Sequence, residues 1–476
     1  MTTWLAIDLG AESGRAILGW LEDGTLRIEE VHRFANEPVA LRGRLSWDLP
    51  RIVHEVRRGI RHAAERTHGR LDGIAVDSWG VDFGLVDRGG HLLQSPVHYR
   101  DRTHIGSLAR VTARVPRDEI WARTGVQLFE INTLFQLAAL RVECPELIDA
   151  AGGLLLVGDL VAYFLGGRPV GERTLASTSQ LIDATTGSWS PSLLDAIDVR
   201  HDLMPEIVES GTIIGRLDDD TTRDAGLASA PPIIAAASHD TAAAVASVPA
   251  ADPGAWAFLS SGTWSIVGVE TRAPSLTTET LERGFTNEAG VAGTTRLLRL
   301  ITGLWIVQEC RRQWARDGDD WSYETLARLA EESTSPASRV DPDDPRFASP
   351  GDMPERVRDA CRERGDRVPN TPGEVVLTVL ESLAEAYARA VRDLEEITGR
   401  AIARLHVVGG GSRHALLNRL TAKATGLPLV VGPVEATAIG NLLLQALATG
   451  EIRSLTELRS IVAASGDIAR LEARAR

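Results

Sequence analysis

The feature that most constrains the fold is a pattern that occurs twice, once near the start of each half of the chain. Residues 4–21 consist of an apolar run, a short polar loop with a glycine, and a second apolar run. Residues 255–269 repeat this order around Ser261-Gly262-Thr263. Each copy predicts a β-hairpin. Two such hairpins at the heads of similar-sized halves indicate a duplicated fold.

The length of the chain also requires more than one hydrophobic core. For 476 residues two large domains are expected, because single cores stop growing at about 250–300 residues. The composition changes at residues 249–254, which are rich in the Pro and Gly that mark linkers. We therefore expect an N-terminal domain at 1–248 and a C-terminal domain at 255–450. Residues 451–476 are predicted to form a peripheral helix.

Charge and cysteine content restrict the partners and the compartment. The formal net charge of −14 disfavours a general nucleic-acid or acidic-membrane partner. Cys144, Cys310 and Cys361 lie far apart, as expected for reduced thiols in the cytoplasm. The N-terminus does not have the pattern of a signal peptide, and no apolar run is long enough to span a bilayer. We expect a cytoplasmic monomer or homodimer that binds neither nucleic acid nor membrane.

Asp8 stands inside the first apolar run, where a carboxylate costs free energy unless it is paired or binds a cation. A hydrated Mg²⁺ suits this position, because it takes one or two carboxylates together with phosphates. The loop that follows, residues 11–15, would let the backbone approach a phosphate chain. Ser261, Gly262 and Thr263 would supply donors to the same chain. The alternative is that both loops are ordinary hairpin turns.

The stretch Pro232–Ala246 passes from an apolar run to an Ala-rich run, which predicts a buried strand followed by a helix. The junction holds Ser238, His239, Asp240 and Thr241. In open parallel sheets, ligands bind just beyond the carboxyl ends of the strands. An Asp at that point is placed to accept a proton from a substrate hydroxyl. The alternative is a helix cap, in which Ser238 or Asp240 only satisfies backbone N–H groups.

A mixture of aromatic and acidic residues follows another apolar run. Asp77, Trp79, Gly80 and Asp82 stand close together after this predicted strand. A ring can cover the C–H face of a sugar while carboxylates bind its hydroxyls, so the group is a candidate sugar site. The alternative is a buried Trp beside a turn.

Three consecutive glycines, Gly409–Gly411, follow the apolar run at 405–408. Such a run is costly in chain entropy. It fits a strand-to-helix turn whose backbone approaches a flat ligand closely, such as adenine with its ribose. We favour nucleotide binding over a plain turn. Upstream, the capping box at 371–374 predicts the start of a long helix that Gly399 ends.

Taken together, these motifs resemble those of the FGGY carbohydrate kinases, and the resemblance extends from about Trp4 to Gly450. Within that family it is strongest to the branch that phosphorylates L-rhamnulose, as at residues 303–305 with Gln308. Five segments occur here in the order seen in the family: the hairpin with Asp8, then residues 77–83, 239–241, 260–264 and 408–412.

The resemblance implies an α/β fold with two actin-like (ribonuclease H-like) ATPase domains that close on a deep interdomain cleft. It implies MgATP-dependent phosphorylation of a ketose at a primary hydroxyl. For the branch named above, L-rhamnulose becomes L-rhamnulose 1-phosphate in L-rhamnose catabolism.

Residue roles follow from the motifs and the resemblance together. Asp240 is expected to be the catalytic base, and Asp8 is expected to hold Mg²⁺ through water. The expected sugar contacts are Gly80, Asp82, His239 and Thr241. The expected ATP contacts are Ala11, Glu12, Ser13, Gly14, Arg15, Thr263, Gln308 and Gly410.

Two positions depart from the pattern of that branch. Leu300 and Leu175 stand where those kinases commonly carry Asn. A leucine cannot replace the hydrogen bonds of an amide, and losing one costs ~1–3 kcal/mol. These departures favour a first alternative, a kinase for another ketose such as L-fuculose or L-xylulose. Two further alternatives are an actin-like ATPase that drives partner binding and a sugar-binding regulator without kinase activity.

Overall fold

The structure, a computed structural model, describes residues 2–250, 255–465 and 468–472. The chain forms two compact units, each built from segments that are distant in sequence. Unit 1 consists of Met1–Ala251, Glu270–Leu297 and Ala436–Ser465. Unit 2 consists of Asp252–Val269, Leu298–Glu435 and Gly466–Arg476.

Within the described residues, unit 1 contains a six-stranded sheet of order β11-β12-β6-β1-β2-β3. Its first hairpin is antiparallel, whereas β6 pairs in parallel with both β1 and β12. The strands are β1 (Thr3–Leu9), β2 (Ser13–Glu22), β3 (Thr25–Ala35), β6 (Gly73–Ser78), β11 (Thr212–Arg216) and β12 (Pro232–Ala235). The predicted hairpin at residues 4–21 is therefore confirmed.

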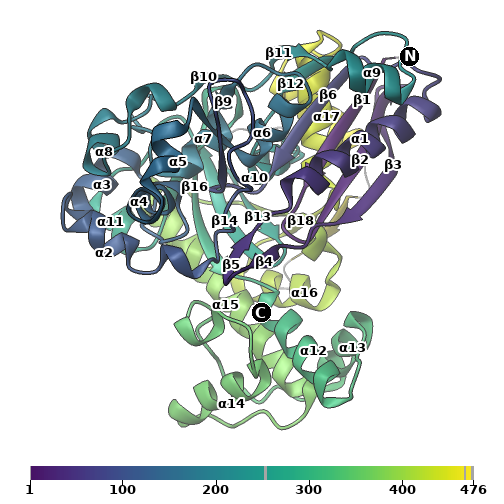
Figure 1. Cartoon of the computed structure of the whole chain (residues 1–476). Helices are drawn as coiled ribbons and strands as arrows, with labels where there is room; N and C mark the ends of the chain where they lie inside the picture. The colour runs from purple at the N-terminus through teal and green to yellow at the C-terminus, as the bar shows by residue number, and fades with distance from the viewer. Residues whose placement is uncertain (1, 251–254, 466–467, 473–476) are drawn as a thin grey trace. The chain divides into compact units, whose positions relative to one another are not determined.

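The central strands β1 and β6 are buried on both faces, which agrees with their largely apolar sequences. Alternate residues of β1 point to opposite faces. Leu5 and Ile7 belong to one core, which also includes residues of α1 (Leu49–Arg66) and α6 (Val157–Phe164). Figure 1 shows α1 lying along β2 and β3.

The opposite face belongs to a second core, which includes Trp4 and Ala6. It is covered by three helices from distant parts of the chain: α10 (Asp240–Ala246), α17 (Ala436–Ala448) and α18 (Leu455–Ser465). The apolar face of α18 thus contributes to the core, so this part of 451–476 differs from the peripheral helix we expected. The predicted linker at 249–254 lies, from residue 251 onward, outside the described residues.

The rest of unit 1 surrounds a third core. It is built from short strands and helices between β6 and β12, together with the segment after residue 270. The elements that contribute to this core are β7 (Phe83–Val86), β8 (Gly153–Leu156), α2 (Ser107–Thr112), α3 (Arg117–Thr124), α4 (Thr133–Glu143), α5 (Pro145–Ala150), α7 (Arg173–Ala176) and α8 (Pro191–Ala196), with α11 (Thr278–Glu282) packed against it. Other elements of unit 1 are β9 (Val170–Glu172), β10 (Glu206–Val208) and α9 (Asp219–Ala225), which contribute to the first core, and β15 (Thr286–Ala289). A small hairpin joins β4 (Val39–Leu41) to β5 (Arg44–Ser46).

Unit 2 repeats the hairpin-and-parallel-strand pattern. The antiparallel hairpin of β13 and β14 confirms the second predicted hairpin, and β13 pairs in parallel with β17. The strands run in the order β16-β14-β13-β17-β18-β19. They are β13 (Trp256–Ser261), β14 (Trp264–Thr271), β16 (Thr295–Thr302), β17 (Arg404–Val408), β18 (Leu429–Val431) and β19 (Ala469–Leu471).

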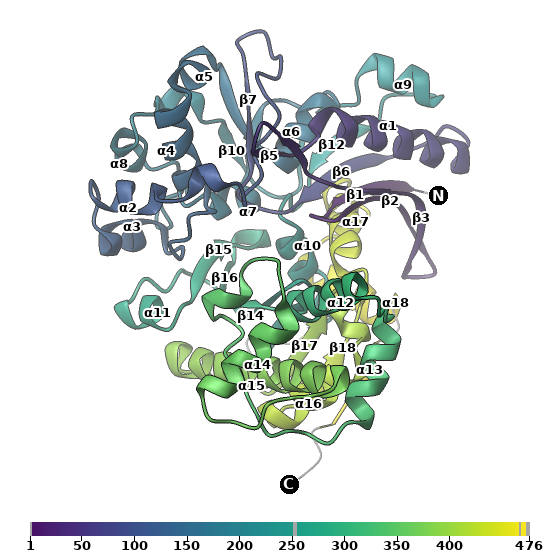
Figure 2. The same ribbon diagram turned by 60° about the horizontal axis from the view of Figure 1, so that its bottom comes forward.

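The long predicted helix of unit 2 is confirmed as α15 (Pro372–Thr398). The side chain of Thr371 accepts from the N–H of Glu374, and Gly399 ends the helix with a φ of 65°. Figure 2 shows α15 beside α16 (Ala415–Thr425). The other helices of this unit are α12 (Trp305–Asp317), α13 (Tyr323–Glu332) and α14 (Met353–Glu363). In the described part of the chain, no helix is both long and apolar enough to cross a membrane.

Candidate active site

Asp240 is the first residue of α10, directly after the junction that follows β12. Its hydrogen bonds within the described residues all fall on Oδ1, which accepts from the backbone N–H (2.5 Å) and the hydroxyl (3.0 Å) of Thr241. Oδ2 is thus left for another partner. About a third of the side chain is exposed (33%), so a substrate can reach it. A helix-capping role would explain the hydrogen bonds to Oδ1 of Asp240, but it gives Oδ2 no partner among the described residues.

Three carboxylates gather at the carboxyl ends of adjacent parallel strands. Asp8 and Asp77 are register partners on β1 and β6, and Asp240 follows β12 on the other side of β6. Burial, together with the charge of Asp8, raises the pKa of Asp240 to about 7. The same two causes raise the pKa of Asp77 well above its ordinary value. Asp240 therefore has the proton affinity that suits a general base near neutral pH.

Asp77 has a hydrogen-bond partner that sequence reasoning did not find. The amide Nδ2 of Asn441 on α17 donates to Asp77 Oδ2 at 2.6 Å. The two residues are 364 positions apart, and no local pattern links them. Oδ1 of Asp77 is buried without a hydrogen-bond partner among the described residues. The packing of α17 therefore holds Asp77, one of the three carboxylates, through the amide of Asn441.

The loop at residues 11–15 joins β1 to β2 beside Asp8. The guanidinium of Arg15 donates to Asp8 Oδ2, as their cross-strand register predicts. Gly14 is buried, whereas Glu12 is exposed and Ala11 and Ser13 are half-buried. The structure thus places Arg15, at the end of this segment, against a carboxylate of unit 1.

The residues present fit a hydrated divalent cation rather than a direct protein cage. No group of three or more His, Cys, Asp or Glu within the described ranges is arranged to hold a metal. Asp8 and Asp240 nevertheless interact electrostatically, with mutual repulsion that a cation would relieve. Mg²⁺ commonly keeps several waters and binds one or two carboxylates plus phosphate oxygens. The carboxylates of Asp8 and Asp240 match this preference of Mg²⁺.

Asp82, an expected sugar contact, lies in an aromatic cluster together with Trp79. The Asp82 side chain is fully buried and accepts from Trp47 Nε1 (2.6 Å), Trp79 Nε1 (3.0 Å), Gln136 Nε2 (2.9 Å) and the N–H of Tyr99 (3.3 Å). Burial raises the pKa of Asp82 to about 7. Both of its oxygens thus accept from protein donors, which hold the indole rings of Trp47 and Trp79 against the carboxylate.

Gly80 lies beside this cluster and against Thr178, whose Oγ1 accepts the N–H of the next residue, Val81, at 3.1 Å. A side chain at position 80 would meet the Thr178 side chain at 2.8–3.0 Å. The backbone here is held tightly, which suits a fixed main-chain contact to a ligand.

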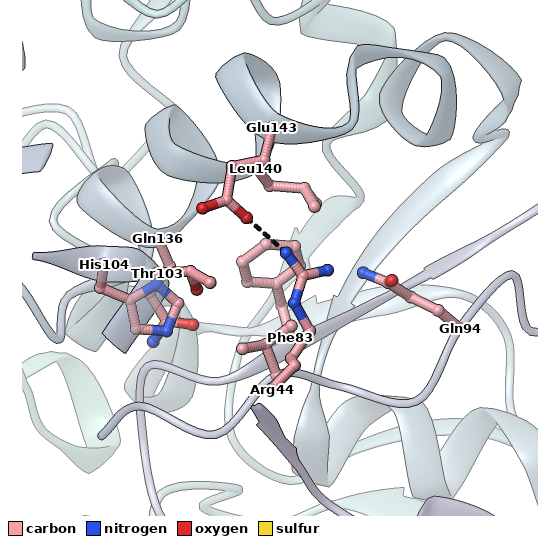
Figure 3. Close-up of a pocket in the computed structure, with 9 residues that line it drawn as sticks. Arg44, Phe83, Gln94, Thr103, His104, Gln136, Leu140 and Glu143 are labelled. Atoms are coloured by element: carbon pink, nitrogen blue, oxygen red, sulfur yellow. Dashed lines mark hydrogen bonds and ion pairs between the residues drawn. The ribbon is translucent and has the colours of Figure 1, made fainter. Parts of the chain in front are cut away.

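A small cavity lined in part by Gln136 has room for about one water molecule. Its volume is about 20 Å³. A cavity needs roughly 10–15 Å³ to hold one water, so this one is too small for a sugar. Figure 3 shows that the Arg44–Glu143 ion pair spans it. His104 also lines it, and its Nδ1 is buried without a partner among the described residues, which makes the cavity a place for water.

In unit 2, the structure brings together two of the expected ATP contacts. Gln308 Nε2 on α12 donates to Thr263 Oγ1 in the hairpin loop at 3.3 Å. Because β13 and β17 are parallel with Ser260 opposite Val408, the glycine turn that follows β17 lies beside the end of β13. Apart from its chain neighbours, no heavy atom of the described residues lies within 4 Å of the place a Cβ on Gly410 would occupy. This open space at Gly410 would allow a ligand to contact the backbone directly.

Comparison with known proteins agrees with this geometry. The model of the N-terminal domain of the FGGY family of carbohydrate kinases matches residues 3–246, and that of the C-terminal domain matches residues 257–449. The chain belongs to the FGGY family of carbohydrate kinases. It is therefore a sugar kinase, a phosphotransferase whose family uses ATP and typically a divalent metal. Both the resemblance and the enzyme class are confirmed.

Individual relatives agree with this assignment, and a solved structure shares the fold. A rhamnulokinase of Bacteroides thetaiotaomicron is 42% identical over 97% of this chain and 94% of that protein. A rhamnulokinase of Enterococcus faecalis is 39% identical over 97% of this chain and 92% of that protein. Glycerol kinase of Plasmodium falciparum superposes with a TM-score of 0.80 at 16% identity, covering 100% of this chain and 94% of that one. The predicted α/β fold with two actin-like ATPase domains is confirmed.

Proposed function

We propose that this FGGY kinase transfers the γ-phosphoryl group of ATP to L-rhamnulose and forms L-rhamnulose 1-phosphate. The observation that carries the proposal is Asp240, a partly exposed carboxylate with a pKa of about 7 and one unoccupied oxygen. The choice of sugar is supported by the two rhamnulokinases that are 42% and 39% identical to this chain.

In the proposed reaction, Asp240 accepts the proton of the sugar's primary hydroxyl. The hydroxyl oxygen forms a bond to the γ-phosphorus, and the bond from that phosphorus to the β–γ bridging oxygen breaks, which releases ADP. Phosphoryl transfer depends mainly on positioning and charge stabilisation. A base that lies next to the hydroxyl and titrates near neutral pH can take up its proton as the bond to phosphorus forms.

A bound Mg²⁺ would supply neutralisation of the phosphate charge. Asp8 is the residue we assign to it, through water. Arg15, which now pairs with Asp8, would be free to contact phosphate once a cation takes over that carboxylate. Together with Arg15 we assign Ala11, Glu12, Ser13, Gly14, Thr263, Gln308 and Gly410 to ATP.

We assign Gly80, His239 and Thr241 to the sugar, with Asp82 acting through Trp79. Of the two departures from the rhamnulokinase pattern, Leu175 is fully buried in the third core of unit 1. Leu300 is half-buried on β16 and is the position that favours another ketose. A kinase for L-fuculose or L-xylulose is therefore the second candidate.

The sugar is tested by coupled ADP release with MgATP across L-rhamnulose, L-fuculose, L-xylulose, D-xylulose and glycerol. We expect the highest kcat/KM with L-rhamnulose. A preference for another ketose would keep the mechanism and replace the substrate. The Leu300→Asn variant would then be expected to restore turnover of L-rhamnulose. Absence of any sugar-dependent ADP release would overturn the proposal.

The base is tested by Asp240→Asn. We expect kcat to fall ~10²–10⁴-fold while ATP binding is retained, because the amide cannot accept the proton. The matched control is Asp218→Asn, which alters a carboxylate that caps α9 and accepts from Thr221 N at 2.8 Å. The control should keep normal turnover. Near-normal turnover of Asp240→Asn would show that another group is the base.

We further infer that the enzyme acts in the cytoplasm as a monomer or homodimer. The three cysteines are free, and Cys310 and Cys361 are buried, which suits a reducing compartment. Fractionation of cells and sedimentation of the purified chain test these two points.

A further inference from the structure

A fully buried arginine lies next to the proposed base, and the mechanism above does not use it. Arg296 on β16 has no exposed surface. Its Nε donates to the carbonyl of Ala289 at 3.1 Å, and its Nη2 lies 3.0 Å from Glu288 Oε2. A buried guanidinium costs free energy even when it is paired, so its position calls for a specific role.

The same Nη2 also lies 3.0 Å from Nδ1 of His239. A guanidinium carries only donors and keeps its proton in proteins. Nδ1 must therefore accept, which requires a lone pair on that nitrogen. A neutral imidazole carries one N–H, so the proton must be on Nε2. Burial and the charge of Arg296 both lower the pKa of His239 well below its ordinary value, in agreement with a neutral ring.

The protonated nitrogen lies beside the base. Nε2 of His239 is 3.3 Å from Oδ1 of Asp240. With its hydrogen on Nε2, the ring is a donor toward Asp240 and toward any acceptor oxygen next to it. It cannot take the substrate proton itself at that nitrogen.

We propose that Arg296 is a positioning residue of this kinase, which holds His239 as the neutral Nε2–H tautomer and so makes it a fixed donor to a sugar oxygen beside Asp240. The role in catalysis rests on the proposed function; the tautomer does not. In a ketose, the carbon next to the reacting C1 hydroxyl carries an oxygen that accepts, either as the ketone or as its hemiketal. Arg296 thus separates the two tasks: Asp240 accepts the proton and His239 donates a hydrogen bond.

Glu288 shows what Arg296 prevents. Its Oε2 lies 3.4 Å from Nδ1 of His239 and is placed to accept a hydrogen from it. Without the guanidinium, the preferred tautomer would be Nδ1–H donating to Glu288. Nε2 would then present a lone pair to Asp240 and to the sugar oxygen, and the hydrogen bond to the substrate would be lost.

The tautomer is tested by NMR of the full chain labelled with ¹⁵N-histidine, which distinguishes the two neutral rings and the imidazolium. The His239→Gln variant identifies the signal among the 11 histidines. We expect the wild-type ring in the Nε2–H form. An Nδ1–H ring or an imidazolium at neutral pH would overturn the proposal, whatever the enzyme's activity.

The role of Arg296 is tested by two substitutions. Arg296→Lys keeps a cationic donor, so it should keep the Nε2–H form. Arg296→Met should shift the ring to Nδ1–H, and KM for the sugar should rise ~10-fold, the value of one hydrogen bond, while KM for ATP stays constant. An unchanged tautomer or an unchanged sugar KM in Arg296→Met would overturn the role. If the Met variant does not fold, the wild-type and Lys spectra still decide the tautomer. If the wild type shows the Nε2–H ring but no sugar-dependent turnover, the proposed function fails and the tautomer stands.

Discussion

At the scale of single residues, this kinase depends on carboxylates whose surroundings oppose their ionisation. Asp240, Asp77 and Asp82 all have raised pKa values, and burial is the largest cause for each. Their uses differ because their partners differ. Asp82 is surrounded by protein donors, whereas Asp240 keeps an oxygen for a substrate.

The raised pKa of Asp240 predicts the pH dependence of activity. A base works only when ionised, so kcat/KM for the sugar should fall as pH falls through about 7. The contribution of Asp240 to folding stability changes with pH in the opposite direction. A folded-state pKa above the unfolded value of 3.8 gives stability that is present at low pH and is lost as pH rises through about 7. Asp240→Asn should therefore have a higher melting temperature than the wild type above that pH. Activity that does not change between about pH 5 and 8 would contradict the assignment.

Asp82 gives a prediction about stability. Asp82→Ala leaves the buried indole N–H groups of Trp47 and Trp79 without their acceptor, and each unsatisfied donor costs ~1–3 kcal/mol. We expect a clearly lower melting temperature and a higher KM for the sugar. The control is Asp202→Ala, whose side chain is largely exposed (74%) and which should melt like the wild type. Equal melting temperatures for both variants would show that Asp82 does not organise the cluster.

At the scale of elements, two neighbouring glycines of the turn after β17 have different surroundings, and only one of them is needed for packing. A Cβ on Gly411 would lie 2.1 Å from Ser261 Oγ and 2.7 Å from Ser261 O, whereas one on Gly410 would meet nothing within 4 Å. Gly411 is therefore required by the close approach of the turn to β13. Gly410 is not required by packing.

These two positions make a matched pair. Gly411→Ala should lower the melting temperature, because the backbone must shift to relieve the overlap. Gly410→Ala should fold normally and raise KM for ATP, because its new methyl group projects into the space assigned to the nucleotide. Kinetics with varied ATP and thermal unfolding measure both effects. A normal KM for ATP in Gly410→Ala would remove that residue from the ATP contacts.

At the scale of the whole molecule, unit 1 is completed by the end of the chain. Its sheet is covered on one face by α10 and α17, which are distant in sequence. The two helices approach closely at Gly440, where a Cβ would lie 1.9 Å from the carbonyl oxygen of Ala243. The neighbouring Asn441 binds Asp77. The position of α17 therefore bears on both stability and the carboxylate group.

Gly440→Ala tests this dependence. The helices must separate to admit the methyl group, which we expect to cost ~1–3 kcal/mol of stability. Because Asn441 moves with α17, kcat should fall as well. Gly410→Ala, the same substitution in open space, is the control for the melting temperature. An unchanged melting temperature in Gly440→Ala would show that the two helices do not approach so closely.

Features that depend on neighbouring residues could be predicted from the amino-acid sequence. Two apolar runs around a short polar loop predicted each hairpin, and the capping box predicted the start of α15, because a hairpin and a helix cap form their hydrogen bonds between residues that are close in sequence. The motif order predicted the family and placed Asp240 at a strand-to-helix junction. Each of these signals lies within a few residues of the feature it specifies.

The tertiary structure was needed to show which distant residues meet. It joined Asn441 to Asp77, Arg296 to His239, and Trp47 and Gln136 to Asp82. It also assigned α17 to unit 1, although the C-terminal family match contains that helix. Hydrophobic periodicity predicts that one face of an element is buried, but it does not predict what covers that face. The hydrophobic effect depends on the apolar area removed from water and not on which partner covers it. The partners of a buried charge are set by how the whole chain packs, and here that packing supplies the donors that separate one carboxylate's role from another's.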